Sequence, residues 1–158
     1  MRVALGADHA GVGLKLEIKR FLDEHRIPYE DFGTHTEESV DYPDFAETVA
    51  RGVASGEFDR GVLICGTGIG MAIAANKVTG VRAAPVADLE SARLSRGHND
   101  ANVLALGARL LPRDRVVDIV RVFLETPFEA GRHERRIRKI TALEQHRDHE
   151  MSERISRG

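Results

Sequence analysis

The sequence predicts an α/β protein, a Rossmann-like three-layer α/β/α sandwich around a five-stranded parallel sheet. Short apolar runs alternate along the chain with longer amphipathic segments. The apolar runs are nearly continuous, which is typical of strands that are covered on both faces. Alternation of such strands with helices indicates a parallel sheet with a helical layer on each side. The length of 158 residues fits one domain of this kind.

Five segments are expected to form the strands of this sheet. Each is short and mostly apolar, and several end at a glycine or an aspartate, which are common turn residues. The stretch "GVLIC" is the clearest strand, and "PYEDFG" is the weakest. The expected strands are 2–8, 28–33, 61–65, 81–88 and 102–107.

The segments between the strands carry apolar residues at helical spacing. Phe45, Val49 and Val53 recur every four residues and would share one helix face. Pro112 is suited to open a later helix, because the first helical position needs no backbone N–H. Helices are expected over 13–25, 45–56, 69–76 and 89–96, after Pro112, and over 132–145. We therefore expect one domain over residues 1–145 and a polar tail over 146–158.

Charge, hydropathy and cysteine content exclude several classes of protein. The formal net charge is −2, which provides no positive field for nucleic acid. No apolar run reaches the roughly 18 residues that a membrane span needs, and the N-terminus lacks a signal-peptide pattern. The single cysteine cannot form an internal disulfide and fits a reducing compartment. We expect a cytoplasmic protein that binds neither nucleic acid nor membrane.

The functional site is expected at one edge of the sheet. In parallel α/β sheets, ligands bind at the carboxyl ends of the strands, where the strand order reverses. Residues that carry chemistry follow four of the expected strands. They are Asp8-His9, Cys65-Gly66-Thr67, Asp88 and Gly107-Ala108-Arg109.

A glycine-spaced turn follows the lone cysteine, Cys65. Gly66, Gly68 and Gly70 permit close approach of a ligand to the backbone. Loop N–H groups and the start of the next helix would stabilise a thiolate there. The alternative is a buried structural cysteine, which is common in proteins. Position 71 excludes two other motifs, because a dinucleotide-binding motif would need glycine there and a cysteine phosphatase would need arginine, whereas the residue is Met71. A phosphate-binding loop of the Gly-Lys-Ser/Thr type is also absent from the sequence.

Two histidine motifs are further candidates. Asp8-His9 closes the first strand, and a surface turn explains it as well as a site does. His98-Asn99 lies in a short polar loop, where a solvent-facing histidine is the simpler interpretation.

The densest positive cluster is "GRHERRIRK" near the C-terminus. Arg132 and Arg136 lie four residues apart and would share a helix face, which suits binding of a phosphate. A solvated basic face is the alternative.

Considered together, these stretches resemble a known family. "GADHAG", "DYP", "ICGTGIGMAIAANK", "SRGHNDANVLALGAR" and "GRHERRI" are similar, in order and spacing, to the ribose-5-phosphate isomerase B family, which also includes galactose-6-phosphate isomerase subunits. The resemblance extends from about Met1 to Gln145 and leaves out only the polar tail.

The resemblance implies an aldose–ketose isomerase that interconverts ribose 5-phosphate and ribulose 5-phosphate through an enediolate. It implies that Cys65 is the base, that His98 assists opening of the furanose ring, and that Thr67 helps to hold the enediolate. Family members with serine at position 65 use a glutamate a few residues later; no glutamate occurs between Gly66 and Asn76, so the chain resembles the cysteine branch. Proton transfer beside a carbonyl needs such a base and donors for the developing oxyanion.

The remaining matched positions are expected to bind the sugar phosphate. They are Asp8, His9, Tyr42, Gly66, Gly68, Ile69, Gly70, Asn99, Arg109, Arg132 and Arg136. The resemblance also implies a homodimer or tetramer with sites shared across the interface, and a C-terminal helix that extends to a partner subunit. No metal and no cofactor are expected.

Two other functions remain open. A six-carbon sugar phosphate, such as allose or galactose 6-phosphate, would need the same chemistry in a longer pocket. A non-catalytic module that binds a sugar phosphate or nucleotide would use the same arginines and glycines but would not need a reactive thiol. A redox protein is disfavoured because the chain has no second cysteine.

Overall fold

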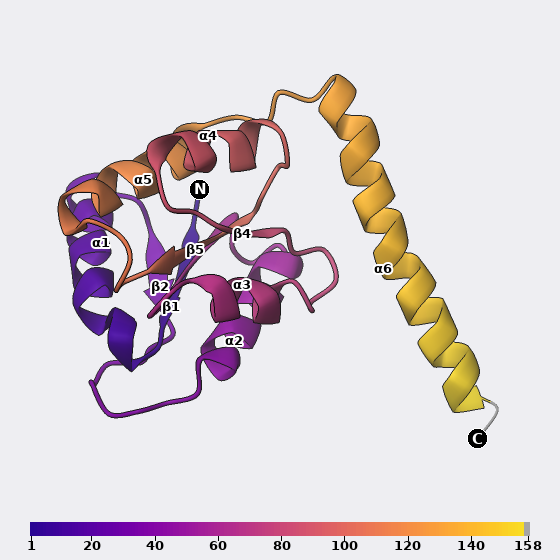
Figure 1. The fold of residues 1–158 in the computed structure, drawn as a ribbon, viewed down its shortest axis with the longest axis horizontal. Coiled ribbons are helices and arrows are strands. Elements are labelled where there is room, and N and C mark those ends of the chain that lie inside the picture. Colours follow the sequence, from indigo (N-terminus) through magenta and orange to yellow (C-terminus); the bar gives the residue numbers. More distant parts are fainter. Residues whose placement is uncertain (157–158) are drawn as a thin grey trace.

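Five parallel strands form one sheet, as predicted (Figure 1). Their order is β2-β1-β3-β5-β4. The structure is a computed structural model that describes residues 1–156, without the side chains of residues 145–151, 153, 154 and 156. The strands are β1 Val3–Ala7, β2 Tyr29–Asp31, β3 Arg60–Cys65, β4 Ala83–Pro85 and β5 Val103–Gly107.

Helices cover both faces of the sheet and make the three layers that the sequence predicts. The helices α1, α4 and α5 lie on one face, and α2 and α3 on the other (Figure 1). Their bounds are α1 Val12–Glu24, α2 Tyr42–Ala54, α3 Ile69–Ala75, α4 Leu89–Gly97, α5 Arg113–Glu125 and α6 Arg132–Ser156, with a short 3-10 helix η1 at His9–Gly11.

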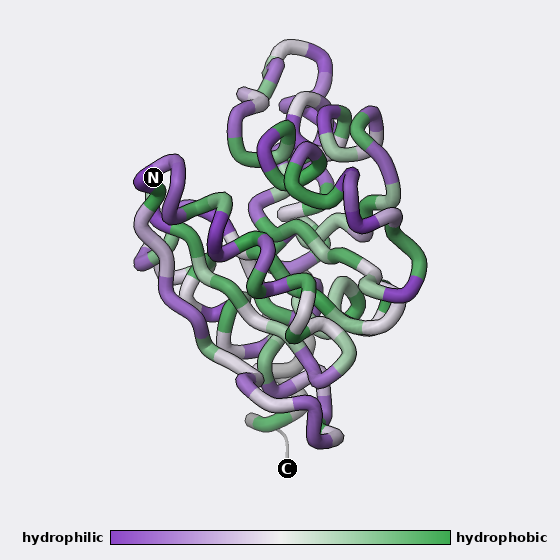
Figure 2. Tube along the Cα trace, turned by 90° about the vertical axis from the view of Figure 1, so that its left-hand side faces the viewer, coloured by the Kyte–Doolittle hydropathy of each residue, from purple (hydrophilic) through white to green (hydrophobic). Residues whose placement is uncertain are grey.

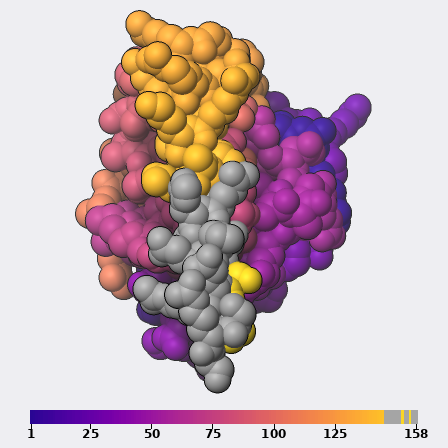
Figure 3. Space-filling view, turned by 90° about the vertical axis from the view of Figure 1, so that its right-hand side faces the viewer, coloured from indigo at the N-terminus to yellow at the C-terminus, as the bar shows by residue number. Residues whose placement is uncertain are grey.

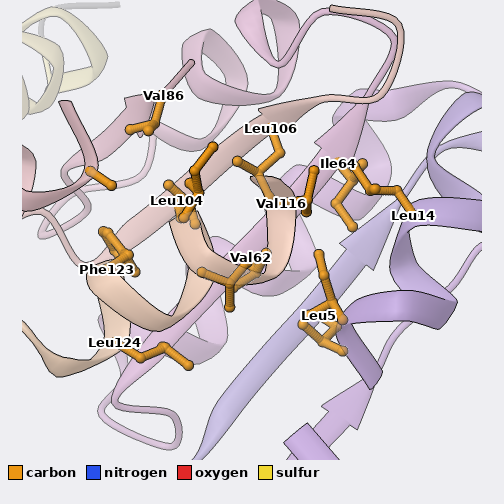
Figure 4. Close-up of a cluster of buried hydrophobic side chains, with 14 of the residues drawn as sticks. Leu5, Leu14, Val62, Ile64, Val86, Leu104, Leu106, Val116, Phe123 and Leu124 are labelled. Atoms are coloured by element: carbon orange, nitrogen blue, oxygen red, sulfur yellow. The ribbon is translucent and has the colours of Figure 1, made fainter. Parts of the chain in front are cut away.

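The sheet separates two hydrophobic cores. Strand residues such as Leu5, Val62 and Leu104 face Val116 and Phe123 of α5, and all are buried (Figure 4). Burial of each large side chain contributes about 1.5–3 kcal/mol. Hydrophobic segments accordingly lie inside and polar ones outside along the trace (Figure 2).

Several element boundaries differ from the sequence prediction. The helix α2 begins at Tyr42 rather than Phe45, because Asp41 is extended and Pro43 fits the first turn. Pro112 precedes α5 as its N-cap. The fourth strand spans only Ala83–Pro85 of the expected 81–88.

The helix α6 stands apart from the three layers (Figure 1). Figure 3 views the molecule from the side of α6, with the first turns of this helix in front of the body. Glu144 accepts a hydrogen bond from the backbone N–H of Gly80 at 3.0 Å, which ties α6 to the turn before β4. The helix continues to Ser156, so the predicted boundary between the domain (1–145) and the polar tail (146–158) falls inside it. That division of the chain stays a prediction. Within the described residues, no helix combines the length and apolar character that a membrane span requires.

The common direction of the strands defines two edges of the sheet. The carboxyl edge is where the strands end, and β1, β3 and β5 end there at Ala7, Cys65 and Gly107. The amino edge is the opposite edge, where the same strands begin. A five-residue strand such as β5 separates these edges by roughly 13 Å.

A buried ion pair fixes α1 to β2. The Lys15 ammonium, 1% exposed, donates to Asp31 at 2.6 Å, and Lys19 donates to the same carboxylate at 2.9 Å. Burial alone would raise the pKa of Asp31, but the hydrogen bonds from Lys15, Lys19 and the Gly33 amide outweigh it and lower that pKa below 3.8.

Asp31→Asn should destabilise the protein by about 3 kcal/mol, because it leaves a buried ammonium without its counter-charge. Urea unfolding at pH 7 measures the loss. Glu47→Gln is the control, since the Glu47–Arg51 pair is exposed and such pairs contribute less than about 1 kcal/mol. Equal stability of D31N and the wild type would contradict this assignment.

The same pair predicts a pH effect. Because the folded pKa of Asp31 lies below its ordinary value of 3.8, the pair stabilises the protein fully above that value. The contribution is lost as the pH falls through the lower folded value. Urea unfolding between pH 5 and pH 2 should therefore show a smaller acid-induced loss for D31N than for the wild type.

Candidate active site

Cys65 ends β3 at the carboxyl edge, as predicted. Its side chain is 4% exposed and packs into the core on the α2 and α3 side. The Sγ atom accepts a hydrogen bond from the backbone N–H of Gly68 at 3.1 Å. The sulfur therefore meets a polar backbone donor although it lies in an apolar core. The packing also satisfies the structural interpretation of this cysteine, so an experiment must separate the two.

Two glycines allow the loop after Cys65 to lie on the end of β5. Gly68 has a φ of +78°, and a Cβ there would lie 2.9 Å from the Leu106 carbonyl carbon. A Cβ on Gly107 would lie 2.6 Å from the Thr67 carbonyl oxygen. Such contacts are too short for any side chain, so the turn needs glycine at both positions.

Arg109 and Tyr42 contact the same loop. The Arg109 guanidinium lies against Gly66, where a Cβ would be 3.0 Å from Nη1. The Tyr42 ring lies against Gly70, with Cζ only 2.6 Å from the position of a Cβ. A cation and an aromatic ring therefore flank the loop that follows the thiol.

Thr67 and Ile69 lie at the exposed part of this loop. The Thr67 hydroxyl accepts a hydrogen bond from the Ile69 N–H at 3.3 Å. The Ile69 side chain is 54% exposed. Both predicted residues are therefore beside Cys65.

Asp8 and His9 also lie at the carboxyl edge. The Asp8 N–H donates to the Ile64 carbonyl at 3.0 Å, and its carboxylate accepts from the N–H groups of Ala10 and Gly11. The carboxylate thus caps η1, and η1 begins with His9. His9 Nδ1 accepts the N–H of Val40 at 3.3 Å. The cap explains the burial of Asp8 without a ligand; its contact with a substrate stays a prediction.

His98 and Asn99 lie at the opposite edge of the sheet. His98 is the C-cap of α4, which returns from the carboxyl end of β4 to the amino end of β5. The Asn99 carbonyl accepts a hydrogen bond at 3.1 Å from Arg82, which precedes β4. Both residues therefore belong to the amino edge.

The predicted arginines of α6 lie near His98. The backbone N–H of Glu129 donates to the Gly97 carbonyl at 3.0 Å, which joins the segment before α6 to the end of α4. His133, between Arg132 and Arg136, stacks on His98 with the ring centroids 4.1 Å apart.

One chain therefore holds the predicted site in two groups. The carboxyl-edge group comprises Asp8, His9, Tyr42, Cys65, Gly66, Thr67, Gly68, Ile69, Gly70 and Arg109. The amino-edge group comprises His98, Asn99, Arg132 and Arg136. The first group lies at the carboxyl ends of the strands, where the site is expected, and the second group lies at the opposite edge.

The structure adds Glu129 and His133 to the amino-edge group. Glu129 Oε2 lies 3.6 Å from His98 Nε2 and 4.0 Å from His133 Nε2. Burial, together with the positive charges of His98, Arg132 and Arg136, lowers the pKa of His133. The four-residue spacing of Glu129 and His133 is only a weak sequence signal that the two side chains lie together. No feature of the sequence indicates that they contact His98.

The three residues are ligand types that zinc accepts. Their arrangement does not suit an ion, however. The two imidazole rings are parallel within 11°, so their in-plane lone pairs cannot meet at one point. Arg93 lies 3.4 Å from the Glu129 carboxylate, and the Arg132 Nε faces His133 at 3.5 Å. We therefore interpret the cluster as a carboxylate counter-charge beside two stacked imidazoles.

Gly68→Ala should destabilise the protein clearly more than Gly56→Ala. Both glycines have a positive φ, +78° and +79°, which strains any other residue by about 1–3 kcal/mol. A Cβ at Gly56 meets nothing within 4 Å, whereas at Gly68 it would meet the backbone of β5. Thermal unfolding measures the difference. Equal losses in the two variants would contradict the close packing of the loop on β5.

Comparison with known proteins agrees with this geometry. The family model for Ribose/Galactose Isomerase matches residues 3–140. Ribose-5-phosphate isomerase B of Escherichia coli is 48% identical over 93% of this chain and 99% of that protein. The Clostridium thermocellum ribose-5-phosphate isomerase B structure matches with a TM-score of 0.90 and 52% identity, over 92% of this chain and 98% of that one.

A second solved structure carries a ligand. Ribose-5-phosphate isomerase B from Mycoplasma genitalium, with bound ribulose-5-phosphate, matches with a TM-score of 0.88 and 42% identity, over 91% of this chain and 96% of that one. The resemblance seen in the sequence is confirmed. The chain belongs to the ribose/galactose isomerase family, among its ribose-5-phosphate isomerase B members.

Proposed function

We propose that the protein interconverts ribose 5-phosphate and ribulose 5-phosphate, with Cys65 as the base. The observation that carries this proposal is the hydrogen bond from the Gly68 N–H to the Cys65 sulfur, in a glycine loop flanked by Arg109. Family membership supports the substrate. The chemistry requires no cofactor, and a reducing cytoplasm would keep the lone thiol unoxidised.

The reaction moves one hydrogen between neighbouring carbons. The Cys65 thiolate removes the proton on C2 of the open aldose, and the C–H electron pair forms the C1–C2 double bond while the carbonyl oxygen becomes anionic. Return of that proton to C1, with transfer of the O2 hydroxyl proton to O1, gives the ketose. Loop N–H groups and the Thr67 hydroxyl would stabilise the anionic intermediate.

Ribose 5-phosphate must first open its ring. The hydroxyl proton on O1 leaves, the bond from C1 to the ring oxygen breaks, and that oxygen receives a proton. His98 would take the first proton and supply the second, since imidazole exchanges protons readily near neutral pH. The two arginines of α6 would hold the phosphate.

The complete site would form between two copies of the chain. A single chain holds Cys65 and His98 at opposite edges of the sheet, so we infer that a second copy brings its amino-edge group to the carboxyl-edge group. Exposed apolar side chains beside the loop support this: Ile73 is 58% exposed and Leu110 is 64% exposed. Such patches mark interfaces, and isologous dimers are the commonest kind.

The position of α6 supports the same assembly. A cavity of about 550 Å³ lies between α6 and the body, and Val81, Asn99 and Leu143 are among the residues that line it. Leu143 is largely exposed. A helix that stands off its own domain with apolar residues uncovered suits packing against a second copy. Pairing of two dimers into a tetramer is compatible with this arrangement.

Cys65→Ala should reduce kcat for ribose 5-phosphate by at least about 100-fold, because it removes the base. The assay follows ketose formation, with circular dichroism to check that the variant folds. Allose 6-phosphate and galactose 6-phosphate should be poorer substrates of the wild type. Turnover of C65A near that of the wild type would disprove the role of the thiol. A wild type that binds but converts none of these sugars would indicate a binding module.

Mixed dimers test whether the site is shared. Co-expression of C65A with His98→Asn should restore activity to about a quarter of the wild type, because half of randomly paired dimers are mixed and each mixed dimer has one intact site. Co-expression of C65A with Cys65→Ser is the matched control. It should stay inactive, because both variants lack Cys65 and no mixed dimer then contains an intact site. A fully active monomer in size-exclusion chromatography would contradict the shared site.

A further inference from the structure

The contact between Glu129 and His98 has no role in the reaction as described so far. Glu129 belongs to the segment between α5 and α6, and its side chain is 47% exposed. Its Oε2 atom lies 3.6 Å from His98 Nε2. The backbone hydrogen bond from Glu129 to Gly97 holds this segment against the end of α4 at 3.0 Å. The backbone therefore places the carboxylate beside the imidazole.

Gly97 provides the space that this carboxylate occupies. A Cβ on Gly97 would lie 2.8 Å from Glu129 Oε1 and 3.2 Å from its Cδ. The φ of Gly97 is outside the left-handed region, so its backbone would accept another residue. The glycine is explained by the position of the Glu129 side chain. This is independent support for a defined carboxylate position.

The surrounding charges make Glu129 the partner of His98. Arg93 of α4 lies 3.4 Å from Glu129 Oε1 and is also held by Glu90 at 2.8 Å. Arg132 and Arg136 add positive charge from α6. In this positive environment, Glu129 supplies the negative charge next to the His98 ring.

His133 limits the movement of the His98 ring. Its imidazole is buried and lies flat on that of His98, with an interplanar angle of 11°. Burial and the nearby positive charges lower the pKa of His133, which favours a neutral ring. His98 is thus held by a stacked ring on one side and a carboxylate at Nε2.

We propose that Glu129 is a positioning residue for His98: it accepts a hydrogen bond from Nε2–H and so leaves Nδ1 unprotonated and free for the sugar. The proposal rests on the proposed function of His98 in ring opening. The hydrogen bond made by one ring nitrogen of a histidine decides which nitrogen carries the proton. A carboxylate in this place also stabilises the imidazolium that forms when Nδ1 takes the O1 proton.

A pair of substrates isolates this role. Ribose 5-phosphate is cyclic, whereas erythrose 4-phosphate cannot close a furanose ring, because its O4 carries the phosphate. Glu129→Gln should lower kcat/KM about tenfold on ribose 5-phosphate and less than about twofold on erythrose 4-phosphate. Glu90→Gln is the matched control: it removes a carboxylate from the same arginine and should leave both values unchanged.

A second variant keeps the carboxylate and displaces it. Gly97→Ala should reproduce the selective loss on ribose 5-phosphate, because its Cβ takes the place of the Glu129 carboxylate.

Nitrogen NMR of the His98 side chain tests the placement without any activity. The wild type should show the Nε2–H tautomer, and E129Q a mixture of both tautomers. Equal losses on the two substrates, or an unchanged tautomer in E129Q, would overturn the proposal. A wild type that converts neither sugar would refute the proposed function instead, and the NMR result would still decide the position of Glu129.

Discussion

The common direction of the five strands constrains everything else in this molecule. Because β1, β3 and β5 end at one edge, the residues that follow them meet there: Asp8, the loop after Cys65, and Arg109. Helices that run back from the carboxyl edge end at the amino edge, and His98 lies there because it is the C-cap of α4. The two edges lie roughly 13 Å apart along β5. This separation supports the proposal that a site that uses both groups forms between two chains.

Cys65 combines burial in the core with a polar contact. Cys65 contributes to the α2 and α3 core, yet its sulfur meets a backbone N–H from its own loop. The position of that donor depends on the left-handed backbone of Gly68 and on the absence of a side chain at Gly107, where β5 ends. The glycines thus do more than admit a ligand, since they determine where the donor points. Core packing restrains the sulfur to one position, which would suit the proposed role of a base that must reach one carbon.

Most of the fold could be predicted from the sequence, because apolar periodicity determines both the element type and the face it buries. Boundaries were less predictable: Tyr42 joins α2 because Pro43 suits a first helical turn. The carboxyl-edge residues could be predicted, since each directly follows a strand. His98 precedes its strand, and that order already indicates the amino edge. The contacts of Glu129 and His133 with His98 could not be predicted, because they depend on how the segment before α6 meets α4.

The two groups also differ in their electrostatic character. The carboxyl-edge group has Arg109 as its cation, and the carboxylate of Asp8 is used by backbone N–H groups. The amino-edge group places Arg132 and Arg136 near two imidazoles, with Glu129 as counter-charge. Arg93 of α4 adds a further positive charge beside Glu129. In the proposed site, the positive amino-edge group would attract the phosphate of the substrate. In the proposed two-chain site, binding of the phosphate would help to position the reacting carbons, so the assembly would contribute to catalysis.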